Sequence, residues 1–100
     1  MVSVERANPG GAPPAGLNPG ELYVVVTGAG GRYEVYVHGE LDLSTAPQLR
    51  EALMGLASEQ GAVVTVDLAG VTFVDSTGLT VLIGGLKRLR QCGGDLNLRS

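Results

Sequence analysis

The chain has 100 residues and a formal net charge of −3 at pH 7, with 44% hydrophobic and only 17% charged residues. This length supports one small globular domain, and the apolar content excludes an intrinsically disordered chain. The acidic balance argues against direct binding to a nucleic-acid backbone, which requires clustered lysine and arginine.

Residues 1–20 are dominated by proline and glycine and show no hydrophobic periodicity, which predicts a flexible leader before a domain over residues 21–100. The opening residues lack the apolar region of a signal peptide, and no stretch reaches the ~18 apolar residues of a membrane span. The single cysteine, Cys92, excludes an intrachain disulfide. We therefore expect a cytoplasmic protein with no membrane association.

Two strands open the domain. Residues 21–27 (ELYVVVT) are rich in β-branched side chains, and residues 32–41 (RYEVYVHGEL) alternate between apolar and polar positions. The glycine-rich GAGG between them predicts a β-hairpin. It lacks the Lys and Ser/Thr of a phosphate-binding loop, so we expect no nucleotide cofactor there.

A helix follows, indicated by leucines at helical spacing: Leu49, Leu53 and Leu56. Thr45 is placed to cap this helix, with Gln48 three residues later completing a capping box. Pro47 falls in the first turn, where its missing N–H costs nothing. Gly55 lowers the helix propensity and predicts a close packing partner at that position.

The second half repeats the pattern of strand and helix. Residues 62–68 (AVVTVDL) read as a central strand that is covered on both faces or at least deeply buried, and residues 69–74 read as a short loop. A helix over residues 76–91 has an apolar stripe at Leu79, Leu82, Ile83, Leu86 and Leu89. Gly93 and Gly94 end it, and a last strand begins at Asp95. The order β-β-α-β-α-β predicts an α/β fold with a partly parallel, mixed sheet and helices packed on it.

The sequence DSTGL places Ser76 at the junction of a strand and a helix, where several kinds of chemistry are conceivable. A hydrolase is disfavoured because the stretch is not G-x-S-x-G and His38 is the only histidine. Glu40, Asp42 and Asp75 could gather only weakly around Mg²⁺, and no spacing indicates a metal site or cofactor.

Two readings of this junction remain. Asp75 and Ser76 are residue types that cap helices. An exposed serine at a helix start is also a suitable phosphorylation site, because the helix dipole tolerates an anion there. The phosphate would face Asp75 and the neighbouring Asp42 or Glu40, so it could repel a docked partner without unfolding the domain.

Two stretches, GELDLSTAPQL (39–49) and VDLAGVTFVDSTGLTVLIGGLKRLRQCGGDLNL (66–98), resemble the STAS domain of bacterial anti-sigma factor antagonists. The resemblance implies partner switching. The unphosphorylated antagonist binds an anti-sigma factor that is also a serine kinase, phosphorylation of Ser76 separates the two, and a phosphatase resets the system. It also implies a partner-binding face formed by Asp42, Asp75, Ser76, Thr77 and Gly78.

STAS chains usually continue beyond the last strand with about one more helix–strand–helix portion, so the C-terminal part of the fold is expected to be short here. Uncovered apolar surface would favour a homodimer. The alternative reading is an accessory STAS subunit of a transporter, or a scaffold in a larger signalling complex. A third reading is an enzyme that uses Ser76.

Overall fold

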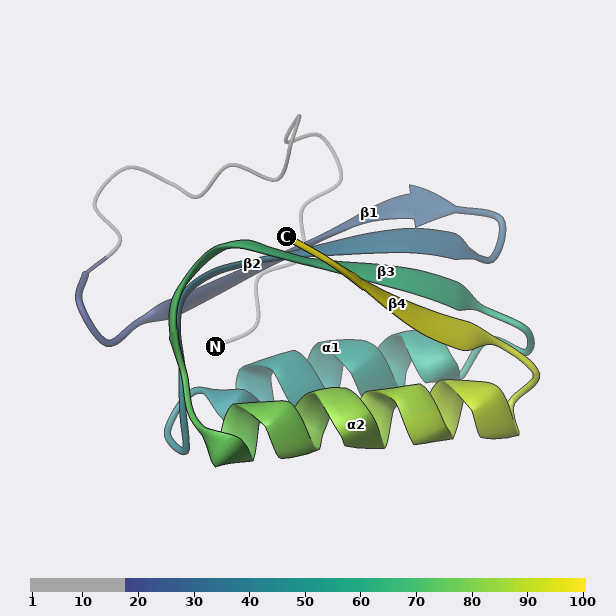
Figure 1. Cartoon of the computed structure of the whole chain (residues 1–100). Coiled ribbons are helices and arrows are strands. Elements are labelled where there is room, and N and C mark those ends of the chain that lie inside the picture. Colours follow the sequence, from purple (N-terminus) through teal and green to yellow (C-terminus); the bar gives the residue numbers. More distant parts are fainter. Residues whose placement is uncertain (1–17) are drawn as a thin grey trace.

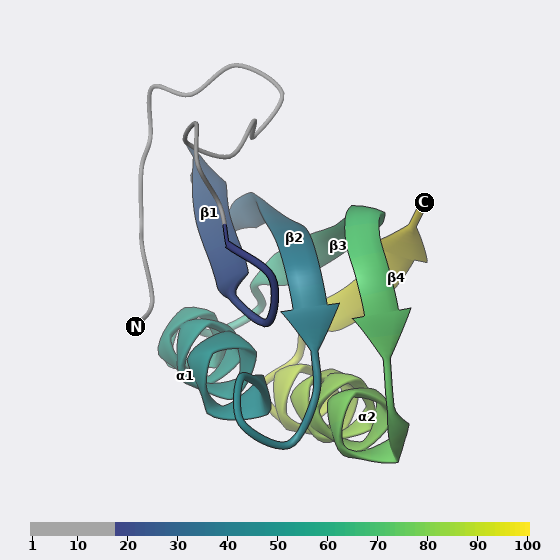
Figure 2. The same cartoon turned by 90° about the vertical axis from the view of Figure 1, so that its left-hand side faces the viewer.

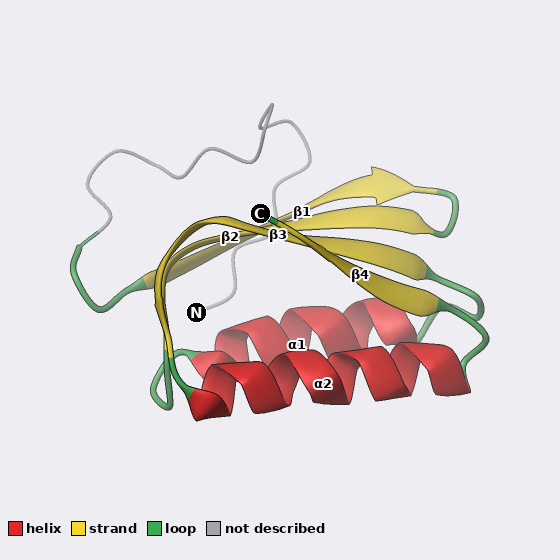
Figure 3. Ribbon diagram, viewed as in Figure 1, coloured by secondary structure: helices red, strands yellow, loops and turns green. Residues whose placement is uncertain are grey.

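The computed structural model describes residues 18–100, which form a four-stranded mixed sheet with two helices packed on one of its faces (Figures 1 and 3). The elements in chain order are β1 (Leu22–Ala29), β2 (Arg32–Leu41), α1 (Ala46–Ala57), β3 (Val63–Val74), α2 (Ser76–Gln91) and β4 (Asp95–Arg99). The strand order in the sheet is β1-β2-β3-β4. The predicted order β-β-α-β-α-β and the α/β class are confirmed.

The predicted hairpin joins β1 and β2, which pair antiparallel along their whole length. The loop is only two residues long, Gly30 and Gly31, with φ of 65° and 83°. Positive φ at both central positions is the requirement of the tight hairpin turn that matches the twist of the strands, and glycine meets it without strain. Strand β1 therefore runs to Ala29, two residues further than predicted.

The remaining strand pairs, β2–β3 and β3–β4, are parallel and are connected through α1 and α2. The core lies between the sheet and the helices and includes Val35, Val37, Val64, Val66, Leu49 and Leu53, all fully buried. Val63, Thr65 and Asp67 alternate with the core residues of β3 and are only partly buried. Strand β3 is therefore deeply buried on its helix-facing side, and its other face is not covered by either described helix.

The loop predicted over residues 69–74 is wrong, because β3 continues through it to Val74. The pairing with β2 shifts register twice, between Tyr36 and His38 and between Gly39 and Glu40, so β3 bends as it approaches α2 (Figure 1). A Cβ atom at Gly70 would lie 2.1 Å from His38 Nδ1, so a larger residue there would require the His38 side chain to move. A glycine inside a strand marks such a close approach or bulge, and the sequence reading mistook it for a loop.

Helix α1 begins as predicted, but its capping box is wrong. Thr45 is the residue before the helix, and its side chain makes no capping hydrogen bond. Its hydroxyl instead donates to the Glu40 carbonyl oxygen at 2.6 Å. The close packing partner predicted at Gly55 is also absent among the described residues, since nothing lies within 4 Å of the Cβ position there.

Helix α2 is rotated relative to the predicted apolar stripe. Leu82 and Leu89 are buried, but Leu79 and Ile83 are 52% and 54% exposed. The buried face is centred on Gly78 and Gly85, where neighbouring side chains come too close for a larger residue. The helix ends as predicted: the Gly94 N–H donates to the Leu89 carbonyl and the Gly93 N–H to the Arg90 carbonyl, with Gly93 at positive φ.

The leader predicted for residues 1–20 lies, up to residue 17, outside the described residues. Its last residue is bonded to the sheet: the Gly20 N–H donates to the Glu40 carboxylate at 2.8 Å. Neither described helix is long and apolar enough to cross a membrane.

Candidate functional site

The loops that follow β2 and β3 lie side by side at one edge of the sheet. Leu41 and Val74 are paired at the ends of these parallel strands, and the Asp75 N–H donates to the Leu41 carbonyl at 3.2 Å. Strand β3 leads into α2 through the single residue Asp75, and β2 leads into α1 through the loop of residues 42–45 (Figure 2). Asp42 and Asp75 therefore follow neighbouring strand ends, as the sequence analysis expected.

Asp75 caps α2, which confirms the structural part of the prediction. Its backbone is extended, with φ −107° and ψ −176°, and its Oδ1 atom accepts from the Gly78 N–H at 3.0 Å. This bond satisfies one of the N–H groups that a helix start leaves without a partner. Ser76 is the first helical residue and is exposed, whereas Thr77 beside it is half-buried.

Gly78 allows the start of α2 to pack directly on the end of β2. A Cβ atom at position 78 would lie 2.7 Å from Leu41 Cγ and 3.1 Å from the Leu41 carbonyl oxygen. Gly78 is buried, so it shapes the turn that presents Ser76 rather than forming part of the exposed surface. The structure therefore places it beneath the predicted partner-binding face.

Asp42 organises the neighbouring loop. Its Oδ1 atom accepts from the backbone N–H groups of Ser44 and Thr45, at 3.0 and 3.1 Å, and from the Ser44 hydroxyl at 2.8 Å. The Ser44 hydroxyl, followed by the two backbone N–H groups, lowers the pKa of this carboxyl against the opposing effect of desolvation. Asp42 therefore remains an anion beside the start of α2.

Sequence reasoning missed the role of Ser44 and Thr45 in this loop. Thr45 is buried, and its Oγ1 atom accepts from the Asp42 N–H at 3.0 Å. The signal was present, because an aspartate followed two and three residues later by Ser and Thr commonly forms such a side-chain-stabilised turn. The spacing of Thr45 and Gln48 predicts a capping box instead, which the structure does not contain.

Apolar side chains close to the motif in the sequence are exposed. Leu43 in the Asp42 loop is 73% exposed, and Phe73 and Leu79, which flank the DSTG stretch, are each 52% exposed. Exposed apolar residues on the elements that lead to and from a polar turn are candidates for contact with a protein partner. We refer to Leu43, Phe73 and Leu79 as the apolar rim of the site.

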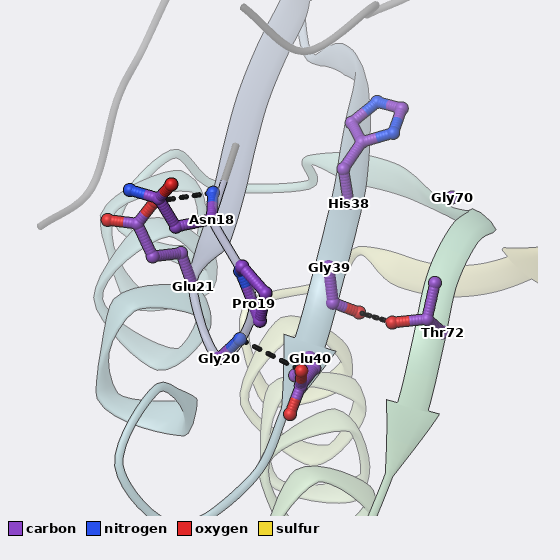
Figure 4. A pocket seen from close by; sticks show the side chains of 9 residues that line it. All are labelled: Asn18, Pro19, Gly20, Glu21, His38, Gly39, Glu40, Gly70 and Thr72. Carbon is purple, nitrogen blue, oxygen red and sulfur yellow. Dashed lines mark hydrogen bonds between the residues drawn. The ribbon is translucent and has the colours of Figure 1, made fainter. Parts of the chain in front are cut away.

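No group of three or more histidine, cysteine, aspartate or glutamate side chains in residues 18–100 could hold a metal ion. An open cavity of about 390 Å³ is lined by residues that include His38, Glu40 and Gly70 (Figure 4). Its lining contains neither Asp42 nor any residue of the DSTG stretch, so it is separate from the site.

Comparison with known families identifies this architecture. The family model described as "Mlab, STAS domain" matches residues 24–100. The chain belongs to the STAS domain family.

The STAS assignment agrees with named relatives. The anti-sigma-B factor antagonist of Bacillus subtilis is 45% identical over 67 residues, which are 67% of this chain and 61% of that protein. The anti-sigma-B factor antagonist of Staphylococcus epidermidis is 48% identical over 66 residues, which are 66% and 59% of the two chains. The matched part of the chain thus spans about three fifths of these curated relatives.

Among solved structures, the chain resembles an anti-sigma factor antagonist from Mycobacterium paratuberculosis. The TM-score is 0.69 at 28% identity, over 83% of this chain and 72% of that one. The predicted mixed sheet of STAS type is confirmed by this likeness.

Proposed function

We propose that this STAS domain is an anti-sigma factor antagonist that binds an anti-sigma factor and is switched off by phosphorylation of Ser76. The observation that carries the proposal is the exposed Ser76 at the capped start of α2, beside the loop organised by Asp42. The names of the curated relatives support the same role. The proposed setting is the cytoplasm, where ATP and sigma factors are found.

The chemistry needs only a kinase and Mg-ATP. The Ser76 hydroxyl oxygen would attack the γ-phosphorus, the bond to the bridging oxygen of ADP would break, and a base of the kinase would accept the hydroxyl proton. We propose that the anti-sigma factor is itself this kinase. A phosphatase would return the serine by hydrolysis of the phosphoester.

The structure favours a change in binding rather than in folding. A phosphate on Ser76 would lie at the positive end of the α2 dipole, where an anion is tolerated. It would add about −1.5 to −2 charges beside Asp42 and Asp75. A partner that covers Ser76 and the apolar rim would then have to bury this charge among other carboxylates, which is costly.

The direct test is the intact mass of the chain after incubation with the anti-sigma kinases of the same organism and Mg-ATP. We expect one added phosphate on the wild type and on Thr77→Ala, and none on Ser76→Ala. Thr77→Ala is the matched control, because it removes the adjacent hydroxyl while leaving Ser76 exposed. A folded sample that no kinase modifies would exclude the phosphorylation switch and favour the role of an accessory or scaffold subunit.

The charge argument has its own test in the affinity for the anti-sigma factor, measured by titration calorimetry. Ser76→Asp should weaken binding by about tenfold or more, because like charges at an interface cost at least ~1.4 kcal/mol. Ser76→Asn has nearly the same size but no charge, and Ser76→Ala removes only the hydroxyl. Both should bind about as well as the wild type. Equal binding by the aspartate and asparagine variants would refute the electrostatic account.

A further inference from the structure

The loop between β2 and α1, residues 42–45, is closed around one buried hydroxyl. Among residues 18–100, Thr45 is the only polar residue that is buried, at 5% exposure. Its hydroxyl has a single proton, which is best placed to bond the Glu40 carbonyl at 2.6 Å, since Asp42 Oδ1 lies farther away at 3.3 Å. The same hydroxyl oxygen accepts from the Asp42 N–H at 3.0 Å. Thr45 therefore ties the end of β2 to the residue that begins the loop.

The other hydrogen bonds of the loop converge on Asp42. Its carbonyl oxygen accepts from the backbone N–H groups of Thr45 and Ala46, at 3.2 and 2.7 Å. Its Oδ1 atom accepts from the Ser44 N–H and hydroxyl and from the Thr45 N–H. Asp42 thus satisfies donors that the start of a helix leaves without partners. These bonds hold its carboxylate in one orientation.

The bonds within the loop use only one oxygen of this carboxylate. Every hydrogen bond that a described residue makes to the Asp42 carboxylate ends on Oδ1. An ionised carboxylate has about four lone-pair sites on its two oxygens, so Oδ2 can accept further bonds. The bond from the Asp75 N–H to the Leu41 carbonyl keeps the loop beside the start of α2. The loop therefore offers an oriented anionic acceptor next to Ser76.

We propose that Thr45 is a positioning residue of the partner-binding face, and that its hydroxyl holds Asp42 so that Oδ2 accepts a hydrogen bond from the anti-sigma factor. Thr45 itself is too deeply buried to touch a partner. It acts through Asp42, by removing conformations of the loop that would otherwise have to be ordered on binding. This inference rests on the proposed function, because it concerns the same face and the same partner.

Two substitutions separate the hydroxyl of Thr45 from its shape. Thr45→Val has nearly the same volume but leaves the Glu40 carbonyl and the Asp42 N–H without this partner. A buried polar group that loses its partner is costly, so the loop should open and let water reach both groups. Thr45→Ser keeps the hydroxyl and loses only a methyl group, so it should keep the loop closed.

The first experiment measures amide hydrogen exchange in the free chain by NMR. We expect Thr45→Val to speed exchange of the Asp42 N–H by about threefold to tenfold, as for the loss of one hydrogen bond, beyond any change at Val37. The Val37 amide, in the middle of β2, reports opening of the whole fold. Thr45→Ser should exchange like the wild type. If Thr45→Val speeds exchange no more at Asp42 than at Val37, the inference is overturned.

The second experiment is a double-mutant cycle on the affinity for the anti-sigma factor, measured by titration calorimetry. Thr45→Val should weaken binding by about threefold to tenfold, whereas Thr45→Ser should bind as well as the wild type. In an Asp42→Ala background, Thr45→Val should cause no further loss, because it acts only through Asp42. Losses that add in the double variant would overturn the inference.

Val64→Ala is the control for a general loss of stability. Val64 is fully buried in β3 and lies outside the loop, so this variant should be less stable and yet bind like the wild type at a temperature where it is folded. Ser44→Ala is a second probe in case Thr45→Val does not fold. It removes one bond to Oδ1 from an exposed residue, and its effect on binding should likewise vanish in the Asp42→Ala background.

The calorimetry also distinguishes failure of this inference from failure of the proposed function. A wild type that binds no anti-sigma factor of its organism would remove the proposed function, and the inference with it. A wild type that binds, together with a folded Thr45→Val variant that binds equally well, would overturn the inference alone and leave the proposed function standing.

Discussion

Single glycines decide how closely α2 approaches its neighbours. Gly78 and Gly84 are both in this helix, but only Gly78 is in contact at its Cβ position, 2.7 Å from Leu41 Cγ. Nothing outside the helix backbone lies within 4 Å of that position at Gly84, among the residues that the structure describes. The same substitution should thus have opposite effects at the two sites.

We expect Gly78→Ala to destabilise the fold by about 1–3 kcal/mol, because the methyl group must displace the end of β2. Gly84→Ala should stabilise it by up to ~1 kcal/mol, since alanine is the better helix former and meets open space. Urea denaturation followed by circular dichroism measures both. A stabilised Gly78→Ala variant would show that the loop before Ser76 is not held by this close contact.

At the scale of elements, the orientation of α2 distinguishes core from surface. Leu82 is 4% exposed and Ile83, its neighbour in the sequence, is 54% exposed. We expect Leu82→Ala to cost about 2–5 kcal/mol of unfolding free energy, because it opens a cavity in the core. Ile83→Ala should change stability by about 0.5 kcal/mol or less in dilute solution. Denaturation at low protein concentration measures both. Equal losses would mean that Ile83 is packed as the apolar stripe first indicated.

The same helix shows what the sequence could and could not predict. Its ends were predictable because they depend on local chemistry, namely the Asp75 cap and the positive φ of Gly93. Its rotation was not predictable, because Gly78 and Gly85 mark the buried side by allowing close contact, and hydrophobic periodicity gives glycine no weight. The length of β3 was missed for a similar reason at Gly70.

The candidate site was partly predictable as well. The sequence could predict that Asp42 and Asp75 lie close together, because each follows one of two neighbouring parallel strands, whose ends meet at one edge of the sheet. The apolar rim could not be derived, since the exposure of Leu43 in its loop and of Phe73 near the end of β3 depends on the three-dimensional path of the chain. Resemblance to a family supplied the role proposed for Ser76, which the geometry alone leaves open between a helix start and a phosphorylation site.

For the molecule as a whole, an ionic cluster ties three strands together on the face without helices. Arg99 on β4 bonds Glu34 on β2 and Asp67 on β3, and it lies 5.8 Å from the ring centre of Tyr36. The Tyr36 hydroxyl and Arg99 lower the pKa of Glu34. The Ala69 N–H and then Arg99 lower that of Asp67. Arg99 thus fastens the edge strand across the sheet.

These lowered pKa values determine how stability should depend on pH. A carboxyl whose pKa is lower in the folded state than in the unfolded chain binds fewer protons when folded, so stability rises with pH through its titration range. We expect the unfolding free energy to be nearly level around neutral pH. It should fall below about pH 4.5, the ordinary pKa of a glutamate, as Glu34 and then Asp67 are protonated in the unfolded chain.

Substitution of Arg99 separates this cluster from the other carboxylates. Arg99→Met keeps the length of the side chain but removes its charge, so the pKa values of Glu34 and Asp67 should move back toward their ordinary range. The loss of stability between pH 5 and pH 3 should therefore be shallower than in the wild type. Arg50→Met, on the exposed face of α1, is the matched control and should retain the wild-type slope. Thermal unfolding at a series of pH values gives all three slopes. Identical slopes for all three proteins would mean that the ion pairs of Arg99 are too strongly screened by water to fasten β4, as happens with many exposed pairs.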